Sequence, residues 1–398
     1  MRAARRPFSS RAVPAAFRPA AGAGRKKVLL VFGTRPEAIK QAPVLFALKS
    51  RGLRTVTCAV SQHGAMLADA LSSFAIRPDY DLGIMRAGQR PGDVLARALT
   101  ALAPLLRREA PDLVLVQGDT TSALAAAFAS LHAGIPCAHV EAGLRSGDPE
   151  NPYPEEINRV LIDALSSLHF APTSSARRNL HGEGFRGSVF TTGNTVVDAL
   201  RRALRRARRP AALRGLAGKT RLILVTLHRR ESFGPTLRRI FGALRELARR
   251  HEDCLWVYPM HPNPEVRRHA SLLRHPRLRV LPPLPYPEFL WLMRRASLIL
   301  TDSGGVQEEA PCLGKPVLVL RRKTERPELL KAGRGILVGT DPDRILREAS
   351  RLLSGPSSRR GMGRAKALFG DGKAASRIAA GVIYFFGEGP RPEDWEGP

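Results

Sequence analysis

The stretch that decides the fold is VLLVFGTRPEAIK, residues 28–40. Its first five residues are apolar and predict a buried strand, and Gly33 permits the tight turn that follows. Pro36 suits the first turn of a helix, which the pattern extends to residue 50. A buried strand joined by a short turn to a helix is the first half of a βαβ unit, and such units build parallel sheets.

The same alternation of short apolar runs and longer amphipathic segments fills the chain. In the first half, strands are predicted at residues 55–60, 113–117, 135–140 and 189–192, and helices at 36–50, 93–109, 121–133 and 155–167. The pattern restarts after residue 210, with strands at 222–226, 255–258, 279–281, 298–300, 317–320 and 335–338. We therefore predict an α/β fold with two Rossmann-like domains and a cleft between them.

The domain limits follow from composition. Residues 1–24 form a leader that is disordered or targeting-like, and residues 25–200 form the first domain. The basic stretch 201–219, which contains Pro210, opens the second domain, expected to run to residue 374. An apolar helix beginning at residue 375 is expected to pack back on the first domain, followed by a tail. A ligand of such a chain would lie at the carboxyl ends of the strands, in the cleft.

The composition narrows the class of protein. The formal net charge of the 398-residue chain is +29, a value that raises the question of nucleic-acid binding. However, the Arg residues are scattered, and no aromatic side chains alternate with them as in a base-stacking groove. We expect a solvated basic surface and no nucleic-acid partner. No apolar run reaches the roughly 20 residues that span a bilayer, so no membrane insertion is expected.

Cysteine usage points to a reducing compartment. The four cysteines, at positions 58, 137, 254 and 312, are isolated, and no CxxC pair occurs. We expect free thiols, no zinc site and a cytoplasmic protein.

Two acids follow neighbouring predicted strands of the first half. Asp119 lies in QGDTT and Glu141 in VEAGLR, each directly after a strand. If these strands are adjacent in a parallel sheet, the two carboxylates emerge at the same edge and form a plausible acid/base pair. The alternatives are a helix N-cap for Asp119 and a surface charge for Glu141. Glu155, in PEEINR, opens a helix, where the dipole favours an acid in any case.

Three other segments suit an anionic ligand. Arg35 and Lys40 accompany the free amides of the first helix start, although a plain basic turn is an equal alternative. His228, in HRR after the first strand of the second half, is a candidate phosphate ligand or acid. The segment TDSGGVQEEA, residues 301–310, joins a strand to a helix start through a Gly pair, and Glu309 is placed to bind ribose hydroxyls.

Taken together, these motifs resemble one family. FGTRPEAIK, QGDTT, VEAGLRSGD, YPEEINR, HRRES, TDSGGVQEEAPCLGKPVLVL and KTERPE occur in the order typical of the non-hydrolysing UDP-N-acetylglucosamine 2-epimerases. The resemblance runs from about Lys27 to Phe386. It implies the GT-B type of two-domain fold, a homodimer, no nicotinamide or metal cofactor, and a role in supplying precursors of cell-surface polysaccharide.

The resemblance also implies roles for individual residues. The catalytic residues correspond to Asp119, Glu141, Glu155 and His228. The residues that bind substrate correspond to Arg35, Lys40, Phe289, Ser303, Gly304, Gly305, Glu309 and Arg326. The expected reaction interconverts UDP-GlcNAc and UDP-ManNAc through elimination of UDP to 2-acetamidoglucal and re-addition. A GT-B glycosyltransferase and a hydrolysing 2-epimerase remain as alternatives.

Some family members also need UDP-GlcNAc at a second site before they run in reverse. This sequence departs from the pattern of that site, because Gly64 and Ala65 follow Gln62-His63 and Gly88 stands where a basic residue is usual. We expect the second site to be lost, unless Arg86 substitutes.

Overall fold

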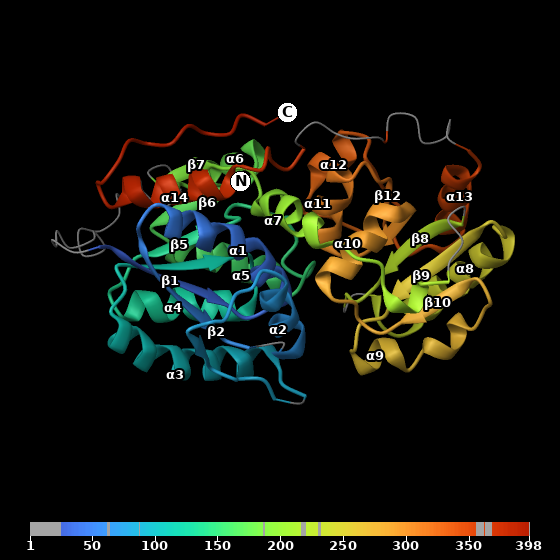
Figure 1. The fold of residues 1–398 in the computed structure, drawn as a ribbon, viewed down its shortest axis with the longest axis horizontal. Helices are drawn as coiled ribbons and strands as arrows, with labels where there is room; N and C mark the ends of the chain where they lie inside the picture. The colour runs from blue at the N-terminus through green and yellow to red at the C-terminus, as the bar shows by residue number, and fades with distance from the viewer. Residues whose placement is uncertain are drawn as a thin grey trace, which may run out of the picture. The chain divides into compact units, whose positions relative to one another are not determined.

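The computed structural model describes residues 25–61, 64–86, 88–185, 188–215, 220–229, 232–355, 362 and 368–397. These residues form two compact units (Figure 1). Unit 1 comprises the described parts of Met1–Ala199 and Phe369–Gly397, and unit 2 those of Leu200–Leu368. The predicted leader, residues 1–24, lies outside the described residues, as do Gln62 and His63.

Unit 1 is built on a seven-stranded parallel sheet with the order β3-β2-β1-β4-β5-β6-β7. Its strands are β1 (Lys27–Phe32), β2 (Arg54–Ala59), β3 (Tyr80–Asp81), β4 (Leu113–Gln117), β5 (Cys137–Val140), β6 (Leu168–Ala171) and β7 (Val189–Thr191). Its helices are α1 (Arg35–Ser50), α2 (Gly64–Ser73), α3 (Pro91–Glu109), α4 (Thr121–His132), α5 (Glu155–Leu165), α6 (Ser174–Gly182), α7 (Thr195–Ala203, which crosses into unit 2) and α14 (Ala374–Phe385).

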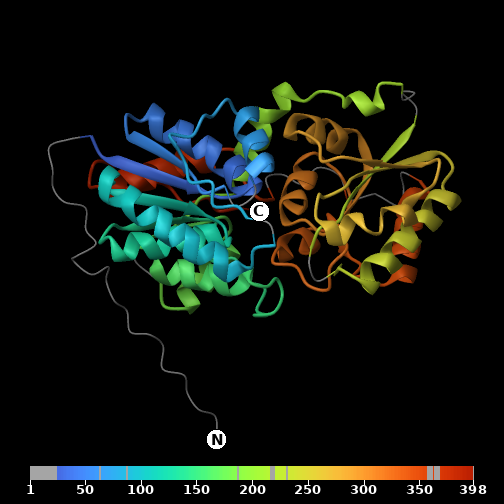
Figure 2. The same cartoon turned by 90° about the horizontal axis from the view of Figure 1, so that it is seen from below.

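Both faces of this sheet are covered by helices, which explains why β1 is apolar from Val28 to Phe32. Val28 and Leu30 pack in a cluster with residues of α1 and α14. Leu29 and Val31 point the other way, into a cluster with α3 and α4. Figures 1 and 2 show α14, late in the sequence, lying beside α1 over one face of the sheet.

Unit 2 contains a six-stranded parallel sheet with the order β10-β9-β8-β11-β12-β13. The strands are β8 (Arg221–Thr226), β9 (Cys254–Pro259), β10 (Leu278–Leu281), β11 (Ala296–Thr301), β12 (Val317–Val319) and β13 (Gly335–Leu337). The α-helices are α8 (Pro235–Arg250), α9 (Pro264–Arg267), α10 (Tyr286–Arg295), α11 (Gly304–Cys312), α12 (Pro327–Lys331) and α13 (Pro342–Leu353).

The predicted fold class is confirmed, because two parallel sheets with alternating helices make two Rossmann-like units. The sequence prediction missed β3 and β6. β3 has only two residues, and β6 reads LHFA, in which a histidine interrupts the apolar run. The helix predicted to reach residue 167 ends at Leu165, because the chain must turn before β6 begins.

Each sheet has one point at which the strand order reverses. In unit 1 this point lies between β1 and β4, and in unit 2 between β8 and β11. At such a point the loops after the two strands run in opposite directions and leave a crevice at the carboxyl ends of the strands. Most of the motifs singled out from the sequence follow these four strands and β5, whereas KTERPE follows β12.

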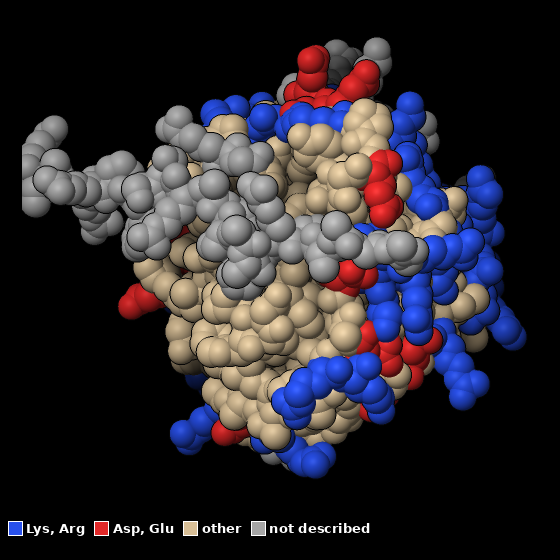
Figure 3. Space-filling model, turned by 90° about the vertical axis from the view of Figure 1, so that its left-hand side faces the viewer, with Lys and Arg blue, Asp and Glu red and all other residues tan. Residues whose placement is uncertain are grey.

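Charged side chains are unevenly distributed. The face of unit 1 shown in Figure 3 has a broad uncharged middle, and basic and acidic side chains are intermixed toward its margins. Within the described part of the chain, no helix is long and apolar enough to cross a membrane.

Candidate functional site

A buried carboxylate ties the two loops of the first reversal point together. Glu37, in the first turn of α1, accepts hydrogen bonds from the amides of Gly33 and Thr34 at 2.8 and 2.6 Å. Its other oxygen accepts from the hydroxyl of Thr120, in the loop after β4, at 2.7 Å. Burial raises the pKa of Glu37 to about 7, although these hydrogen bonds oppose the shift. Glu37 thus fixes the loop that carries Asp119.

Asp119 follows β4 and is held by two residues of α5. Nη2 of Arg159 donates to its carboxylate, and the side-chain amide of Asn158 donates to its backbone carbonyl at 2.9 Å. The side chain of Asp119 keeps 28% of its surface exposed. The carboxylate is therefore ion-paired and still partly accessible. The alternative role as helix N-cap belongs to Thr120, whose hydroxyl accepts from the amide of Ala123.

Glu141 follows the neighbouring strand β5, in register with β4. Its side chain is almost fully buried and forms an ion pair with Nζ of Lys40 at 2.5 Å. The amide of Asn194 donates to the same oxygen at 3.0 Å. The backbone of Glu141 is left-handed, with φ 70°, which is uncommon for a residue with a side chain and occurs often at functional sites. The alternative of a plain surface charge is wrong.

The two acids of PEE have different environments. Glu156 is buried and accepts from the amides of Ser146 and Gly147 and from Arg159, so it holds the loop after β5. Glu155 is only partly buried. Of the two, Glu155 is the better placed to reach a ligand.

Part of the predicted anion site at the start of α1 is taken by an acid of the same helix. The amides of Gly33 and Thr34, just before the helix, donate to Glu37. Lys40 lies against Glu141 instead of projecting from the helix start. Arg35, partly exposed in the first turn, is the basic residue still directed to the surface of this segment. A carboxylate at the third position of a helix can accept hydrogen bonds from the amides just before that helix.

In unit 2, too, a buried carboxylate joins the loops after the two diverging strands. Asp302, fully buried after β11, accepts from the amides of His228 and Arg229 after β8, at 2.8 and 2.9 Å. Burial raises the pKa of Asp302, and the two amides oppose this. Its other oxygen lies 3.3 Å from Nδ1 of His228. Asp302 thereby fixes the backbone of His228 and lies beside its imidazole, which is one third exposed.

The start of α11 fits an anion better than the start of α1. Its first backbone amides are those of Gly304 and Gly305. Amides in the first turn of a helix have no carbonyl of the same helix to which they can donate. The guanidinium of Arg326 lies against Gly304, and a Cβ at that position would come within 2.8 Å of its Cζ. Glu308 and Glu325 hold this guanidinium in place. Ser303 stands at the N-cap position of the helix, and its side chain makes no cap hydrogen bond.

Glu309 and Phe289 complete the predicted residues of unit 2. Glu309 is buried and accepts from the hydroxyl of Tyr286 at 2.5 Å. Tyr286 and the partly buried Phe289 both lie in the first turn of α10. The tyrosine, which the sequence prediction did not include, therefore orients the glutamate expected to bind ribose.

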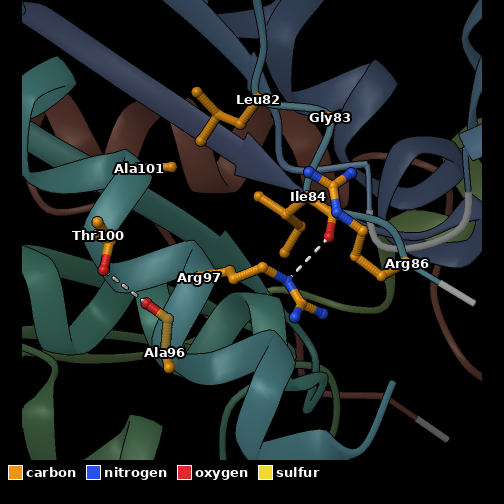
Figure 4. Close-up of a pocket in the computed structure, with 8 residues that line it drawn as sticks. All are labelled: Leu82, Gly83, Ile84, Arg86, Ala96, Arg97, Thr100 and Ala101. Atoms are coloured by element: carbon orange, nitrogen blue, oxygen red, sulfur yellow. Dashed lines mark hydrogen bonds between the residues drawn. The ribbon is translucent and has the colours of Figure 1, made fainter. Parts of the chain in front are cut away.

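A separate open pocket lies between the segment after β3 and α3 (Figure 4). It is lined by Leu82, Ile84, Arg86, Arg97 and Thr100, among others. The guanidinium of Arg97 donates to the carbonyl of Ile84 at 3.1 Å and to Gln89. Arg86, considered above as a substitute ligand of a second site, borders this pocket, whereas Gln62 and His63 lie outside the described residues.

Several residues of the candidate site were missed from the sequence. They are Glu37, His139, Arg159, Asp163, Asn194, Tyr286 and Asp302. Most are buried polar residues that contact a loop and not a ligand, so no motif of ligand-binding type marks them. One signal was present: Glu156, Arg159 and Asp163 recur on one face of a helix, at a spacing where apolar residues are expected.

Comparisons with known proteins identify the family of this chain. The family model described as UDP-N-acetylglucosamine 2-epimerase matches residues 47–382. The UDP-N-acetylglucosamine 2-epimerase of Escherichia coli (strain K12) is 49% identical over 364 residues, which are 88% of this chain and 97% of that protein.

Two solved structures show the same fold. The S. aureus protein MnaA, solved with UDP, superposes with a TM-score of 0.88 at 39% identity, covering 93% of this chain and 100% of that one. The UDP-GlcNAc 2-epimerase of Neisseria meningitidis, solved with UDP-GlcNAc, gives a TM-score of 0.85 at 39% identity, covering 90% and 100%.

Proposed function

This chain belongs to the UDP-N-acetylglucosamine 2-epimerase family, and from that premise we propose that it reversibly converts UDP-GlcNAc to UDP-ManNAc without hydrolysis. It is an epimerase, and hence an isomerase. The observation that carries the more specific proposal is the pair of ion-paired carboxylates, Asp119 and Glu141, at the ends of adjacent strands.

The chemistry requires more than one proton carrier. The C2 hydrogen of the sugar is not next to a carbonyl, so direct deprotonation is slow. In the proposed route a base takes the C2 proton, the C2–H electron pair forms a C1=C2 double bond, and UDP leaves with the C1–O electron pair. UDP then adds back to C1 while an acid delivers a proton to the other face of C2. Such proton transfers typically contribute ~10²–10⁴-fold each.

Unit 1 supplies the groups for these transfers. Asp119, Glu141 and Glu155 all follow or open elements at the same edge of the sheet. Two cations, Arg159 and Lys40, contact the first two of these acids, and an opposite charge in contact favours the ionised form of a carboxylate. A simple sugar transferase needs fewer such groups, which disfavours the glycosyltransferase alternative.

Unit 2 supplies groups suited to UDP. The amides of Gly304 and Gly305 and the guanidinium of Arg326 would stabilise the negative charge of the departing diphosphate. His228, beside Asp302, offers a further donor. Glu309, oriented by Tyr286, would accept hydrogen bonds from ribose, with Phe289 on the same helix turn as the tyrosine.

Proton NMR of UDP-GlcNAc with the enzyme in D₂O tests this function. We expect UDP-ManNAc to form without added cofactor, with deuterium at C2 in both epimers. Epimerised product that retains its C2 proton would exclude the elimination route. Release of free ManNAc with UDP would establish the hydrolysing alternative, and an inert mixture that reacts only with an added sugar acceptor would establish a transferase.

We also propose that the enzyme is a homodimer, formed through α4 and α5 of unit 1. These helices pack together and expose five apolar side chains, each 36–45% accessible: Phe128, Leu131, Ile157, Val160 and Leu161. Two copies of a chain with net charge +29 repel one another over most of their surface. An uncharged apolar face is compatible with a copy of itself.

Light scattering after gel filtration tests the dimer. Ile157→Asp with Leu161→Asp should give monomers, because each subunit would bring two new charges to the same contact. Val280→Asp in unit 2 changes a side chain of similar exposure, 37%, and serves as the control that should remain dimeric. A wild-type chain of monomeric mass would contradict the proposal.

A further inference from the structure

Helix α5 has its charged residues on the inside and apolar residues on the outside. Glu156, Arg159 and Asp163 are 4%, 2% and 0% exposed, whereas Ile157 and Leu161 are 42% and 45% exposed. The three charged residues are spaced by three and four positions, so they lie on one face of the helix. Burying three charged groups on one helix is costly unless each has a partner.

Each of the three residues has a partner in a loop that carries a catalytic acid. Glu156 accepts from the amides of Ser146 and Gly147, in the loop after β5. Arg159 donates to Asp119, in the loop after β4, and its Nη1 donates to Glu156 at 2.7 Å.

Asp163 forms the centre of the third set of contacts. It accepts from Nδ1 of His139 at 2.6 Å, from the amide of Gly143 at 3.1 Å and from Arg145 at 2.7 Å. The other ring nitrogen of His139 contacts the carbonyl of Gly118, the residue before Asp119, at 2.8 Å. Burial would raise the pKa of Asp163, but His139 and Arg145 outweigh it and lower the pKa to about 2. The loops after β4 and β5 are thus fixed to the same helix.

On the basis of the epimerase reaction above, we propose that Arg159 is a positioning residue that keeps Asp119 ionised and fixed in direction, so that Asp119 enters the reaction as the proton acceptor. The guanidinium is itself fixed by Glu156, which is held by the loop after β5. If Arg159 moved, its contacts with Asp119 and Glu156 would break, and Glu156 holds the loop after β5. An opposite charge in direct contact favours the ionised form of a carboxylate, typically by ~1–3 pKa units.

Other charged groups near Asp119 do not replace this effect. Glu156 lies on the far side of Arg159. Glu37 contacts the adjacent Thr120, and its negative charge would oppose ionisation of Asp119. His139 and Asp163 reach only the carbonyl of Gly118 and are paired with each other. Arg159 contacts the carboxylate of Asp119 directly.

The test compares Arg159→Gln with Arg159→Lys in the full chain. For Arg159→Gln we expect the acidic limb of the kcat/KM profile for UDP-GlcNAc to move up by at least ~1 pH unit. At pH values below the wild-type limb, a shift of this size should lower activity about 10-fold relative to the wild type, and the loss should disappear well above the shifted limb. Arg159→Lys keeps the charge, so its limb should stay near that of the wild type. Arg108→Gln, which alters a largely exposed guanidinium of the same unit, is the control.

An equal loss of activity at every pH in Arg159→Gln, with the acidic limb unmoved, would overturn the proposal and leave Arg159 a structural role. The double variant Asp119→Asn/Arg159→Gln should be no slower than Asp119→Asn alone, because Arg159 acts through that carboxylate. An additional loss would contradict this coupling.

A second measurement separates this inference from the proposed function. The carboxyl ¹³C signal of Asp119, identified by its absence in Asp119→Asn, can be titrated without any substrate. A midpoint below the ordinary value of ~3.9 in the wild type and in Arg159→Lys supports the inference even if the enzyme proves inactive on UDP-GlcNAc. A midpoint at or above that value in the wild type overturns it, whether or not Arg159→Gln folds.

Discussion

The two reversal points have the same topology but opposite chemistry. In each, a buried carboxylate joins the loops after the two diverging strands: Glu37 in unit 1 and Asp302 in unit 2. Glu37 accepts from the amides of Gly33 and Thr34, just before its own helix, and the acids Asp119 and Glu141 follow the neighbouring strands. Asp302 reaches across to the other loop, and the amides at the start of α11 stay available.

The difference shows that a shared fold does not fix the charge that a site presents. The position of a single buried acid contributes to whether the site presents acids or amides. An acid three residues inside the helix satisfies the amides next to it, whereas an acid before the helix, directed at the neighbouring loop, leaves them for an anion. Unit 1 thus suits proton transfer and unit 2 suits a diphosphate.

The largest effect is expected from the acids of unit 1. Asp119→Asn and Glu141→Gln keep shape but cannot take a proton, so each should lower turnover of UDP-GlcNAc at least ~100-fold. The turnover is measured by following the formation of UDP-ManNAc by NMR. Binding of UDP, measured by calorimetry, should change little. Glu388→Gln, at an exposed acid of the same unit, is the control, and wild-type turnover in both catalytic variants would contradict the assignment.

A smaller effect is expected at the anion site of unit 2. Gly304→Ala places a methyl group 2.8 Å from Cζ of Arg326, which must move away from the helix start. We expect UDP to bind about 10-fold more weakly, the loss of roughly one charge-assisted hydrogen bond. Gly242→Ala, in α8 of the same unit, is the control, since nothing lies within 4 Å of its added carbon. Equal UDP affinities of the two variants would show that Arg326 does not contribute to the anion site.

A third effect concerns stability and pH. Because the pKa of Glu37 is raised to about 7 in the folded chain, the native state binds more protons than the unfolded state between about pH 4.5 and 7. Stability should therefore decrease as the pH rises through this range, by an amount on the order of 3 kcal/mol from this one group. Glu37→Gln cannot titrate, so its melting temperature should fall less than that of the wild type between pH 5 and pH 8. Parallel curves would show that Glu37 ionises normally.

The smallest effect is expected from deleting residues 1–24, which precede the first strand of unit 1. Their composition, rich in Arg, Ala and Pro, favours no packed core. Turnover and melting temperature should remain those of the full chain. A marked loss of either would mean that unit 1 depends on its leader.

Much of this protein was predictable from its sequence. The period of its apolar residues determined two parallel α/β units, because strands covered on both faces must be apolar throughout, as residues 28–32 are. The motifs also located the loops that carry Asp119, Glu141, His228 and Gly304, since carboxyl ends of parallel strands gather at one edge.

Only the tertiary structure decided how those groups are partnered. It joined Lys40 to Glu141, 101 positions apart, and Arg159 to Asp119, and it turned the charged face of α5 inward. The physical reason is that a local pattern records what a residue can do, but burial and pairing depend on segments far away in the chain. A buried charge is stable only where the fold brings an opposite charge or a donor to it.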